Sequence, residues 1–268
     1  MSLTSAELSF AEIARTLDAV AAEAGAIAMR WFRPGEKTSA RTDYKHGGSP
    51  VTEADLAVDA FLAERLQPLF PDAAWLSEET ADSDVRLSRE TVIVVDPIDG
   101  TRGFADGDTR WSVSIALVRD GRPVAGAIAA PATGDRFMAS AGGGAWRNGA
   151  RLAVSSSTLA GGRLAGPQPS TGKVARALEM NVVPRIPSLA VRFAQVAEGT
   201  LEGALSSANS HDWDIAAADL ILHEAGGLLA GLDGARPRYN RADLKHGPLA
   251  AASRATHPEL LAAFARAQ

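Results

Sequence analysis

Acidic side chains recur where the sequence predicts that a strand ends or a helix begins. Asp96 and Asp99 follow the apolar run 92–95, whose composition is typical of a buried strand. Glu78 follows another short apolar stretch, and Asp214 lies in the first turn of a predicted helix. Carboxylates that share one pocket either raise each other's pKa or recruit a cation. We therefore expect Asp96 at the C-terminal edge of its strand and a cation between these side chains.

The side chains available as ligands indicate which kind of cation would bind, namely a hard one. The chain has no cysteine and five scattered histidines, so carboxylate oxygens would be the donors, which favours Mg²⁺ or Mn²⁺ over Zn²⁺. Magnesium commonly binds through a few carboxylates together with substrate phosphate oxygens. Gly100 and Thr101, directly after Asp99, are typical of a turn or short helix whose N–H groups can hold an anion. The combination predicts phosphoryl chemistry.

Each of these signals alone has an ordinary structural explanation. An acid in the first turn of a helix is usually a cap or a partner of the helix dipole. An Asp-Gly pair is usually a turn. Only the combination of these features in one chain predicts a metal site.

The elements that position these residues follow from hydrophobic periodicity. Apolar residues recur every three or four positions over 6–32, which predicts a long amphipathic helix, and a second helix begins at Thr52. The polar, glycine-containing segment between them carries Lys45 and is typical of a flexible loop that closes over a ligand. Three β-rich runs predict a mostly antiparallel sheet: 91–96, 111–121 and 123–130.

The second half of the chain alternates short strand-like runs with helical stretches, a pattern typical of α/β structure. A Ser/Gly-rich stretch over 155–166 is a candidate boundary between the halves. We therefore expect an N-terminal α+β domain, 1–154, that carries most of the acids. A C-terminal α/β domain, 155–268, would contribute Asp214 and substrate contacts.

Composition excludes several classes of function. The chain has 268 residues and a formal net charge of −5, so it lacks the broad basic field that nucleic-acid polymers or anionic membranes attract. The lack of cysteine excludes disulfides, thiolate zinc sites and a cysteine nucleophile. No apolar run reaches the roughly 18 residues of a membrane span, and the N-terminus lacks a signal-peptide pattern. A soluble, cytoplasmic protein is expected.

Four motifs together resemble the signatures of the inositol monophosphatase family. They are PVTEAD (50–55), SEET (77–80), DPIDGTRGF (96–104) and WDIAAADLILHEAGG (213–227), in the order and spacing usual for that family. The resemblance covers essentially the whole chain. It implies a layered αβαβα fold, usually a homodimer, and a magnesium-dependent, lithium-sensitive phosphomonoesterase. The family includes 3′(2′),5′-bisphosphate nucleotidases and is distantly related to fructose-1,6-bisphosphatase.

The resemblance also implies roles for individual residues. Two or three Mg²⁺ ions, replaceable by Mn²⁺, would be held by the side chains or main-chain carbonyl of Glu78, Asp96, Ile98, Asp99 and Asp214. Asp55 and Thr101 would orient and deprotonate the water that attacks phosphorus directly, and Glu78 would assist. The amides of Gly100 and Thr101 would hold phosphate oxygens. Lys45 would approach the phosphate or a third metal.

A second phosphatase class also has an Asp-x-Asp-Gly-Thr motif after a strand. Haloacid-dehalogenase-type phosphatases use its first aspartate as a nucleophile. In this chain two residues, not one, separate Asp96 from Asp99, and the nucleophile position falls on Pro97. Covalent aspartyl catalysis is therefore disfavoured.

The expected substrate is a small phosphorylated metabolite, and two positions bear on its identity. Arg102 stands where nucleotidase-like relatives tend to carry Lys or Arg, although it could instead pair with Asp106 or Asp108. Ser207 replaces the glutamate that binds an inositol hydroxyl in inositol monophosphatases, unless Asn209, His211 or Asp212 substitutes for it. We place His211 near the substrate. The order of preference is 3′-phosphoadenosine 5′-phosphate, then inositol 1-phosphate, then other small phosphomonoesters. A non-catalytic phosphometabolite-binding homologue is the alternative of another class.

Overall fold

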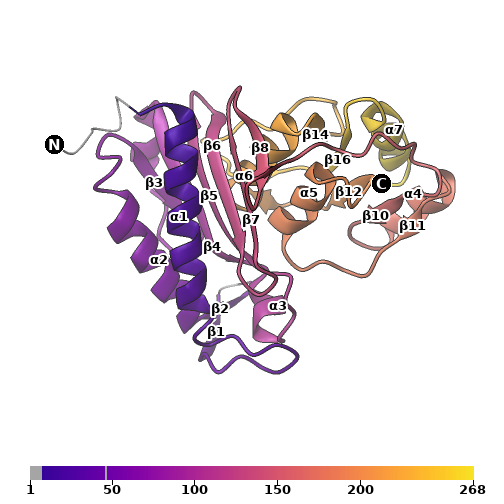
Figure 1. Cartoon of the computed structure of the whole chain (residues 1–268). Coiled ribbons are helices and arrows are strands. Elements are labelled where there is room, and N and C mark those ends of the chain that lie inside the picture. Colours follow the sequence, from indigo (N-terminus) through magenta and orange to yellow (C-terminus); the bar gives the residue numbers. More distant parts are fainter. Residues whose placement is uncertain (1–7, 46) are drawn as a thin grey trace.

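Helices α1 (Phe10–Ala28) and α2 (Glu53–Leu66) form one outer layer of the molecule (Figure 1). The computed structural model describes residues 8–45 and 47–268. Both helices begin with reciprocal capping by side chains: Ser9 with Glu12 in α1, and Thr52 with Asp55 in α2. α1 is shorter than the expected 6–32 helix, because the chain turns after Ala28 ahead of Pro34-Gly35.

The polar segment between the two helices, expected as a flexible loop, contains a short hairpin over 42–52. β1 (Thr42–Tyr44) pairs antiparallel with β2 (Pro50–Thr52). Gly47 and Gly48 adopt positive φ at the turn, a conformation that glycine adopts without steric penalty. Lys45 lies directly after β1, and its backbone N–H donates to the carbonyl of Ser49 at 2.8 Å. The hairpin thereby holds Lys45 at its tip.

A seven-stranded sheet packs against α1 and α2, with its strands in sequence order. β3 and β4 are parallel and are joined through the 3₁₀ helix η2 (Asp84–Ser88); the remaining neighbours are antiparallel, as the sequence predicted. The strands are β3 (Ala74–Ser77), β4 (Thr91–Asp99), β5 (Ser112–Arg119), β6 (Arg122–Ala130), β7 (Asp135–Ser140), β8 (Gly144–Arg147) and β9 (Ala150–Arg151).

Strand β4 does not end at Asp96, as the sequence suggested, but continues to Asp99. Asp96 pairs with Ser114 and Asp99 with Ser112, so β4 carries one extra residue there, a β-bulge. In a regular strand, side chains three positions apart point to opposite faces. The bulge shifts this alternation by one residue, which allows Asp96 and Asp99 to approach the same site.

Helices α5 (Leu189–Ala197) and α6 (Asp212–Glu224) lie between the first sheet and a second, five-stranded sheet (Figure 1). α6 is buried around most of its circumference, as expected for a helix with sheets on both sides. The strand order of the second sheet is β11 (Asn181–Val182), β10 (Arg163–Ala165), β12 (Gly203–Ser206), β16 (Leu249–Ser253) and β14 (Gly227–Gly231).

The remaining elements complete the layers. Helices α4 (Ser170–Ala177) and α7 (His257–Arg266) cover the second sheet, and the short helix α3 (Thr101–Ala105) follows β4 directly. β13 (Ser210–His211) and β15 (Lys245–His246) form a separate antiparallel pair at the start of α6. The result is the expected αβαβα sandwich. Among the described helices, none combines the length and the apolar character that crossing a bilayer requires.

Candidate active site

Three carboxylates converge where the bulged end of β4 meets the first turn of α6. Asp96, Asp99 and Asp214 each offer an oxygen atom, and these oxygens lie within 4.8 Å of one another. Asp96 and Asp99 are buried, and the side chain of Asp214 is 21% exposed. Residues from the two halves of the chain thus form one acidic centre.

Burial and mutual repulsion disfavour the ionised forms of these acids. Burial raises the pKa of Asp96 well above its usual range, and the charges of Glu78 and Asp99 raise it further. Burial, followed by the charge of Asp99, does the same to the pKa of Asp214. A divalent cation that accepts oxygen ligands would remove this repulsion. A group of three carboxylates fits Mg²⁺, which prefers hard oxygen donors.

The start of α5 orients Asp99. The Ser188 hydroxyl donates to Asp99 Oδ2 at 2.5 Å, and the backbone N–H groups of Leu189 and Ala190 donate to the same carboxylate at 3.2 and 2.7 Å. Burial nevertheless raises the pKa of Asp99 to about 6. Sequence reasoning missed Ser188, although a serine directly before an apolar helical pattern is an N-cap signal.

Asp55 and Thr101 are hydrogen-bonded, as their paired expected role requires. The Thr101 hydroxyl lies 3.1 Å from Asp55 Oδ1 and 2.9 Å from the carbonyl oxygen of Ile98. The other oxygen of Asp55 accepts from the backbone N–H and the hydroxyl of Thr52. Asp55 is fully buried, which raises its pKa to about 6. The pair therefore combines a buried carboxylate with a hydroxyl that can relay a proton.

Glu78 and Lys45 meet beside the acidic centre. Lys45 Nζ lies 2.8 Å from Glu78 Oε1 and 2.7 Å from Glu79 Oε1. Glu78 is outside the group of three close carboxylates, but its charge raises the pKa of Asp96 and Asp55. Burial raises the pKa of Glu79 to about 7. The hairpin lysine thus neutralises the edge of the acidic centre in this arrangement.

Gly100 makes the tight connection between β4 and α3. Its φ of +91° is in the left-handed region, and a Cβ atom there would lie 3.0 Å from the backbone nitrogen of Ser188. Only glycine accommodates both the conformation and the close approach. The connection places the amides of Gly100 and Thr101 at the beginning of α3, where helix N–H groups lack intrahelical acceptors.

Arg102 has no carboxylate partner within residues 8–45 and 47–268, and its guanidinium donates a hydrogen bond to the carbonyl of Gly48 at 3.4 Å. The acids with which it could have paired are occupied elsewhere. Lys37 forms an ion pair with Asp106, and Arg110 binds Asp108 through two nitrogens. The structural explanation of Arg102 as a partner of these acids is therefore wrong, and an exposed guanidinium stands one residue after Thr101.

The residues just before Asp214 differ in their exposure and in their contacts. His211 is the N-cap of α6; its backbone N–H donates to Asp214 Oδ2 at 2.6 Å, and its ring stacks on Trp213 at 4.6 Å between centroids. Ser207 is exposed between β12 and β13. Asp212 is fully buried and bonded to His246 and Asn240. Asp212 is thus unable to replace a substrate-binding glutamate.

Arg192 is a charged residue near the site that sequence reasoning missed. Its guanidinium donates to the carbonyls of Leu205 and Ile186 at 3.0 and 2.7 Å, and its buried Nε has no acceptor among the described residues. Burial lowers its pKa to about 10, while the charge of Asp99 acts in the opposite direction. A single charged residue in the mostly apolar sequence of α5 was the available signal.

Comparison with known proteins decides the family. The model of the inositol monophosphatase family matches residues 10–268. The chain belongs to this family. It is therefore a metal-dependent phosphomonoesterase of the inositol monophosphatase superfamily, a magnesium-dependent group, and its Asp96, Asp99 and Asp214 cluster could bind metal.

The names of curated relatives within the family refer to different substrates. The chain is 31% identical over 219 residues to the 3′(2′),5′-bisphosphate nucleotidase CysQ of Aggregatibacter actinomycetemcomitans, covering 74% of this chain and 77% of the relative. It is 32% identical to an inositol-1-monophosphatase of Mesorhizobium japonicum (85% and 88% covered). A histidinol-phosphatase of Mycobacterium tuberculosis is 36% identical (72% and 78% covered). Overall identity therefore does not choose among the branches.

Solved structures agree with the family assignment of the fold. The extragenic suppressor protein suhB from Bartonella henselae superimposes with a TM-score of 0.82 at 27% identity, covering 94% of this chain and 98% of that one. The Thermotoga maritima inositol monophosphatase superimposes with a TM-score of 0.79 at 25% identity, covering 93% and 95%. This chain has the inositol monophosphatase type of αβαβα fold along nearly its whole length.

Proposed function

We propose that this chain is a 3′(2′),5′-bisphosphate nucleotidase that converts 3′-phosphoadenosine 5′-phosphate to AMP and inorganic phosphate. The observation that carries the proposal is the exposed Arg102, which has no carboxylate partner in the described part of the chain. A guanidinium is well suited to a phosphate group, which it can bind through two N–H donors. A substrate with two phosphates can occupy the acidic centre and Arg102 together, whereas inositol 1-phosphate offers one phosphate.

The surroundings of Ser207 also support a nucleotide over an inositol ester. Hydrogen bonding to ring hydroxyls favours a carboxylate acceptor, and Ser207 supplies only a hydroxyl. The nearby carboxylate of Asp212 has both oxygens bonded and is sealed from solvent. Release of myo-inositol from inositol 1-phosphate is therefore the alternative rather than the preferred activity.

The side chains of the site divide into metal-holding and proton-transferring groups. Mg²⁺ would be held by carboxylate oxygens and one main-chain carbonyl, from Glu78, Asp96, Ile98, Asp99 and Asp214. When bound, Mg²⁺ would neutralise phosphate oxygens and increase the acidity of a water molecule. Thr101 would accept a hydrogen bond from the attacking water while its own hydroxyl proton is held by Asp55. Asp55, ionised above its pKa of about 6, would receive the proton.

Further anion contacts come from groups beside this pair. The amides of Gly100 and Thr101 would donate to phosphate oxygens, Lys45 would move from the glutamates toward the phosphate, and His211 and Ser207 would border the nucleoside. From family membership we also propose lithium inhibition, a cytoplasmic location and a homodimer. A non-catalytic binding protein is disfavoured because all the acids and the hydroxyl assigned to metal and water are present: Asp55, Glu78, Asp96, Asp99, Thr101 and Asp214.

The test compares phosphate release from 3′-phosphoadenosine 5′-phosphate, inositol 1-phosphate and histidinol phosphate, with Mg²⁺ and with chelator. We expect kcat/KM for the nucleotide to exceed the others at least 100-fold, which corresponds to about 2.7 kcal/mol of transition-state discrimination. A preference for either of the other substrates would refute the nucleotidase assignment. Absence of turnover on all three with Mg²⁺ would favour the binding-protein alternative.

The role of Arg102 is tested by Arg102→Met on two nucleotides that differ by one phosphate. We expect kcat/KM for 3′-phosphoadenosine 5′-phosphate to fall at least tenfold, while that for adenosine 3′-monophosphate changes less than twofold. Arg15→Met, an exposed arginine on α1, is the matched control and should change neither value. Equal losses on both nucleotides would show that Arg102 does not read the second phosphate.

A further inference from the structure

A chain of buried polar contacts links the segment after Glu78 to the start of α6. Arg86 in η2 is 1% exposed and binds Asp82 through two nitrogens, at 2.7 and 2.9 Å. Its remaining nitrogen donates to the side-chain oxygen of Asn240 at 2.9 Å and to the carbonyl of Arg241 at 2.8 Å. Arg86 therefore connects the β3–β4 crossover with a loop of the C-terminal half.

Asn240 carries the connection from Arg86 to Asp212. Its side-chain amide donates to the carbonyl of Arg86 at 2.9 Å, and its backbone N–H donates to Asp212 Oδ2 at 2.7 Å. The other oxygen of Asp212 lies 2.7 Å from His246 Nε2. Asp212 is fully buried and His246 is 6% exposed, so these contacts are shielded from solvent.

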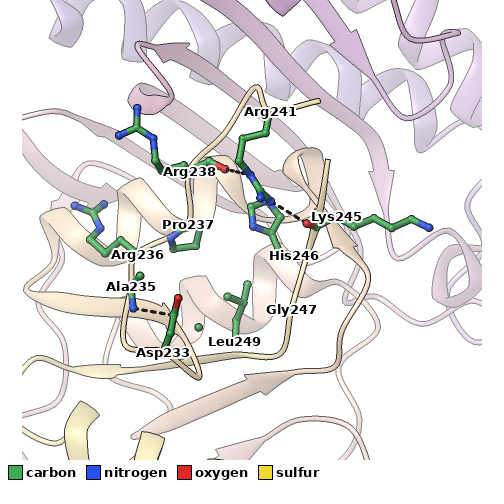
Figure 2. Close-up of a pocket in the computed structure, with 11 residues that line it drawn as sticks. Asp233, Ala235, Arg236, Pro237, Arg238, Arg241, Lys245, His246, Gly247 and Leu249 are labelled. Atoms are coloured by element: carbon green, nitrogen blue, oxygen red, sulfur yellow. Dashed lines mark hydrogen bonds between the residues drawn. The ribbon is translucent and has the colours of Figure 1, made fainter. Parts of the chain in front are cut away.

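Hydrogen bonds within the loop that carries Asn240 and His246 stabilise its conformation. Figure 2 shows the Arg241 side chain bonded to the carbonyls of Arg238 and Lys245, on the two limbs of the loop. In the same view Lys245 extends away from the ring of His246, as alternation along a strand requires. This internal bracing holds His246 beside Asp212.

These contacts bear on the metal site because Asp212 is the first residue of α6 and Asp214 is in the same turn. We infer that Arg86, Asn240, Asp212 and His246, here called the polar strut, are positioning residues that fix Asp214 relative to Glu78 and the β4 acids. The inference rests on the proposed metal site. Stability alone does not explain the polar strut, since apolar side chains of similar volume can fill a buried site at least as favourably.

The polar strut is tested by Mn²⁺ binding to the full-length protein, measured by titration calorimetry. Asn240→Gly retains the backbone N–H and tolerates the φ of +55°, but removes the link to Arg86. His246→Ala removes the other partner of Asp212. We expect each variant to raise the Mn²⁺ dissociation constant at least tenfold, as loss of partners behind metal ligands does. His246→Gln, which can still donate an N–H to Asp212, should recover part of the affinity.

The matched control is His257→Ala in α7, since His257 is 2% exposed and bonds the carbonyl of Ala250 at 3.1 Å on the far side of the second sheet. It should lower the melting temperature in chelator without changing the Mn²⁺ dissociation constant. If Asn240→Gly and His246→Ala behave like this control, the polar strut is merely structural and the inference is overturned. If the wild-type protein fails to bind Mn²⁺, the metal site itself is refuted, and the inference with it.

Discussion

Asp96 shows how the environment of one residue sets its chemistry. It is 1% exposed, it accepts a hydrogen bond from the backbone N–H of Ile98 at 3.1 Å, and it faces the charges of Glu78, Asp99 and Asp214. Without a cation these surroundings favour the protonated carboxyl. The geometry that suits Mg²⁺ is therefore unfavourable for the metal-free protein.

Replacement of Asp96 by Asn should separate the contribution of Asp96 to magnesium binding from its cost to the metal-free protein. We expect Asp96→Asn to lower kcat at least about 100-fold, the scale of losing one preorganised electrostatic contact in an active site. The same variant should melt at a higher temperature than wild type in chelator at pH 8, because a neutral amide requires neither the buried charge nor the proton uptake that the carboxyl requires there. Thermal denaturation with and without Mg²⁺, together with phosphate release, measures both. Asp72→Asn, at an exposed position, is the control, and near-full activity of Asp96→Asn would defeat the metal assignment.

Sequence reasoning found the acids because their types and spacing are local features. It missed Ser188, which donates to Asp99 from 89 residues further along the chain, and Arg192, whose approach to Asp99 depends on the docking of α5. It also allowed Asp212 to contact substrate, whereas Asp212 is fully buried and bonded to His246. Partners contributed by distant segments leave no periodic signal in the sequence.

The start of α5 shows how one element can serve both stability and the site. Ser188 accepts a hydrogen bond from the backbone N–H of Val191 at 2.9 Å, which caps the helix, and donates to Asp99. The bulge in β4 supplies the complementary geometry by bringing Asp99 to this helix end. The orientation of Asp99 is thus set by contact between two elements.

Ser188→Ala should reveal the double role. Loss of the cap should lower the free energy of unfolding by about 1 kcal/mol, and loss of the hydroxyl should raise the Mg²⁺ concentration needed for half-maximal activity several-fold. Ser9→Ala removes the cap of α1, which is far from the acids in sequence and lies in the outer layer, and serves as control. It should cost similar stability and leave magnesium activation unchanged. Unchanged activation in Ser188→Ala would show that the backbone N–H groups alone orient Asp99.

Elements with strong periodicity were predictable, and short ones were not. The β-rich runs 91–96, 111–121 and 123–130 correspond to β4, β5 and β6, and the helix after Thr52 is α2. The β1–β2 hairpin escaped prediction because each strand has three residues, too few to show alternation. The bulge in β4 depends on its register with β5, which a single strand does not reveal.

The protonation of the site affects the stability of the whole molecule. Burial raises the pKa values of Asp55 and Asp99 to about 6 and that of Glu79 to about 7, from ordinary values of 3.8 and 4.5. The folded protein therefore holds protons that the unfolded chain releases. Stability from these groups is fully present below their unfolded pKa values and is lost as pH rises through the folded ones.

We therefore predict a pH-dependent stabilisation by Mg²⁺. The difference in melting temperature between saturating Mg²⁺ and chelator should increase from about pH 5 to about pH 7, because the cation replaces the lost protons. Burial lowers the pKa of His223 and of His257, so the stability contributed by these two groups rises with pH. This contribution is the same with Mg²⁺ and with chelator and therefore cancels in the difference. Scanning calorimetry at several pH values measures the difference. A difference that is constant or falls over this range would contradict the prediction.

The central position of α6 has a consequence for synthesis of the protein. Every strand of the seven-stranded sheet precedes α6 in the chain, and the sheet face that packs on α6 includes Val92, Val94, Val118 and Ile128. A ribosome therefore releases this sheet before the helix that covers it exists, since chains emerge N-terminus first. During that interval an apolar surface is open to solvent and to other nascent chains. The order of layers along the chain makes chaperone protection most valuable between translation of β9 and of α6.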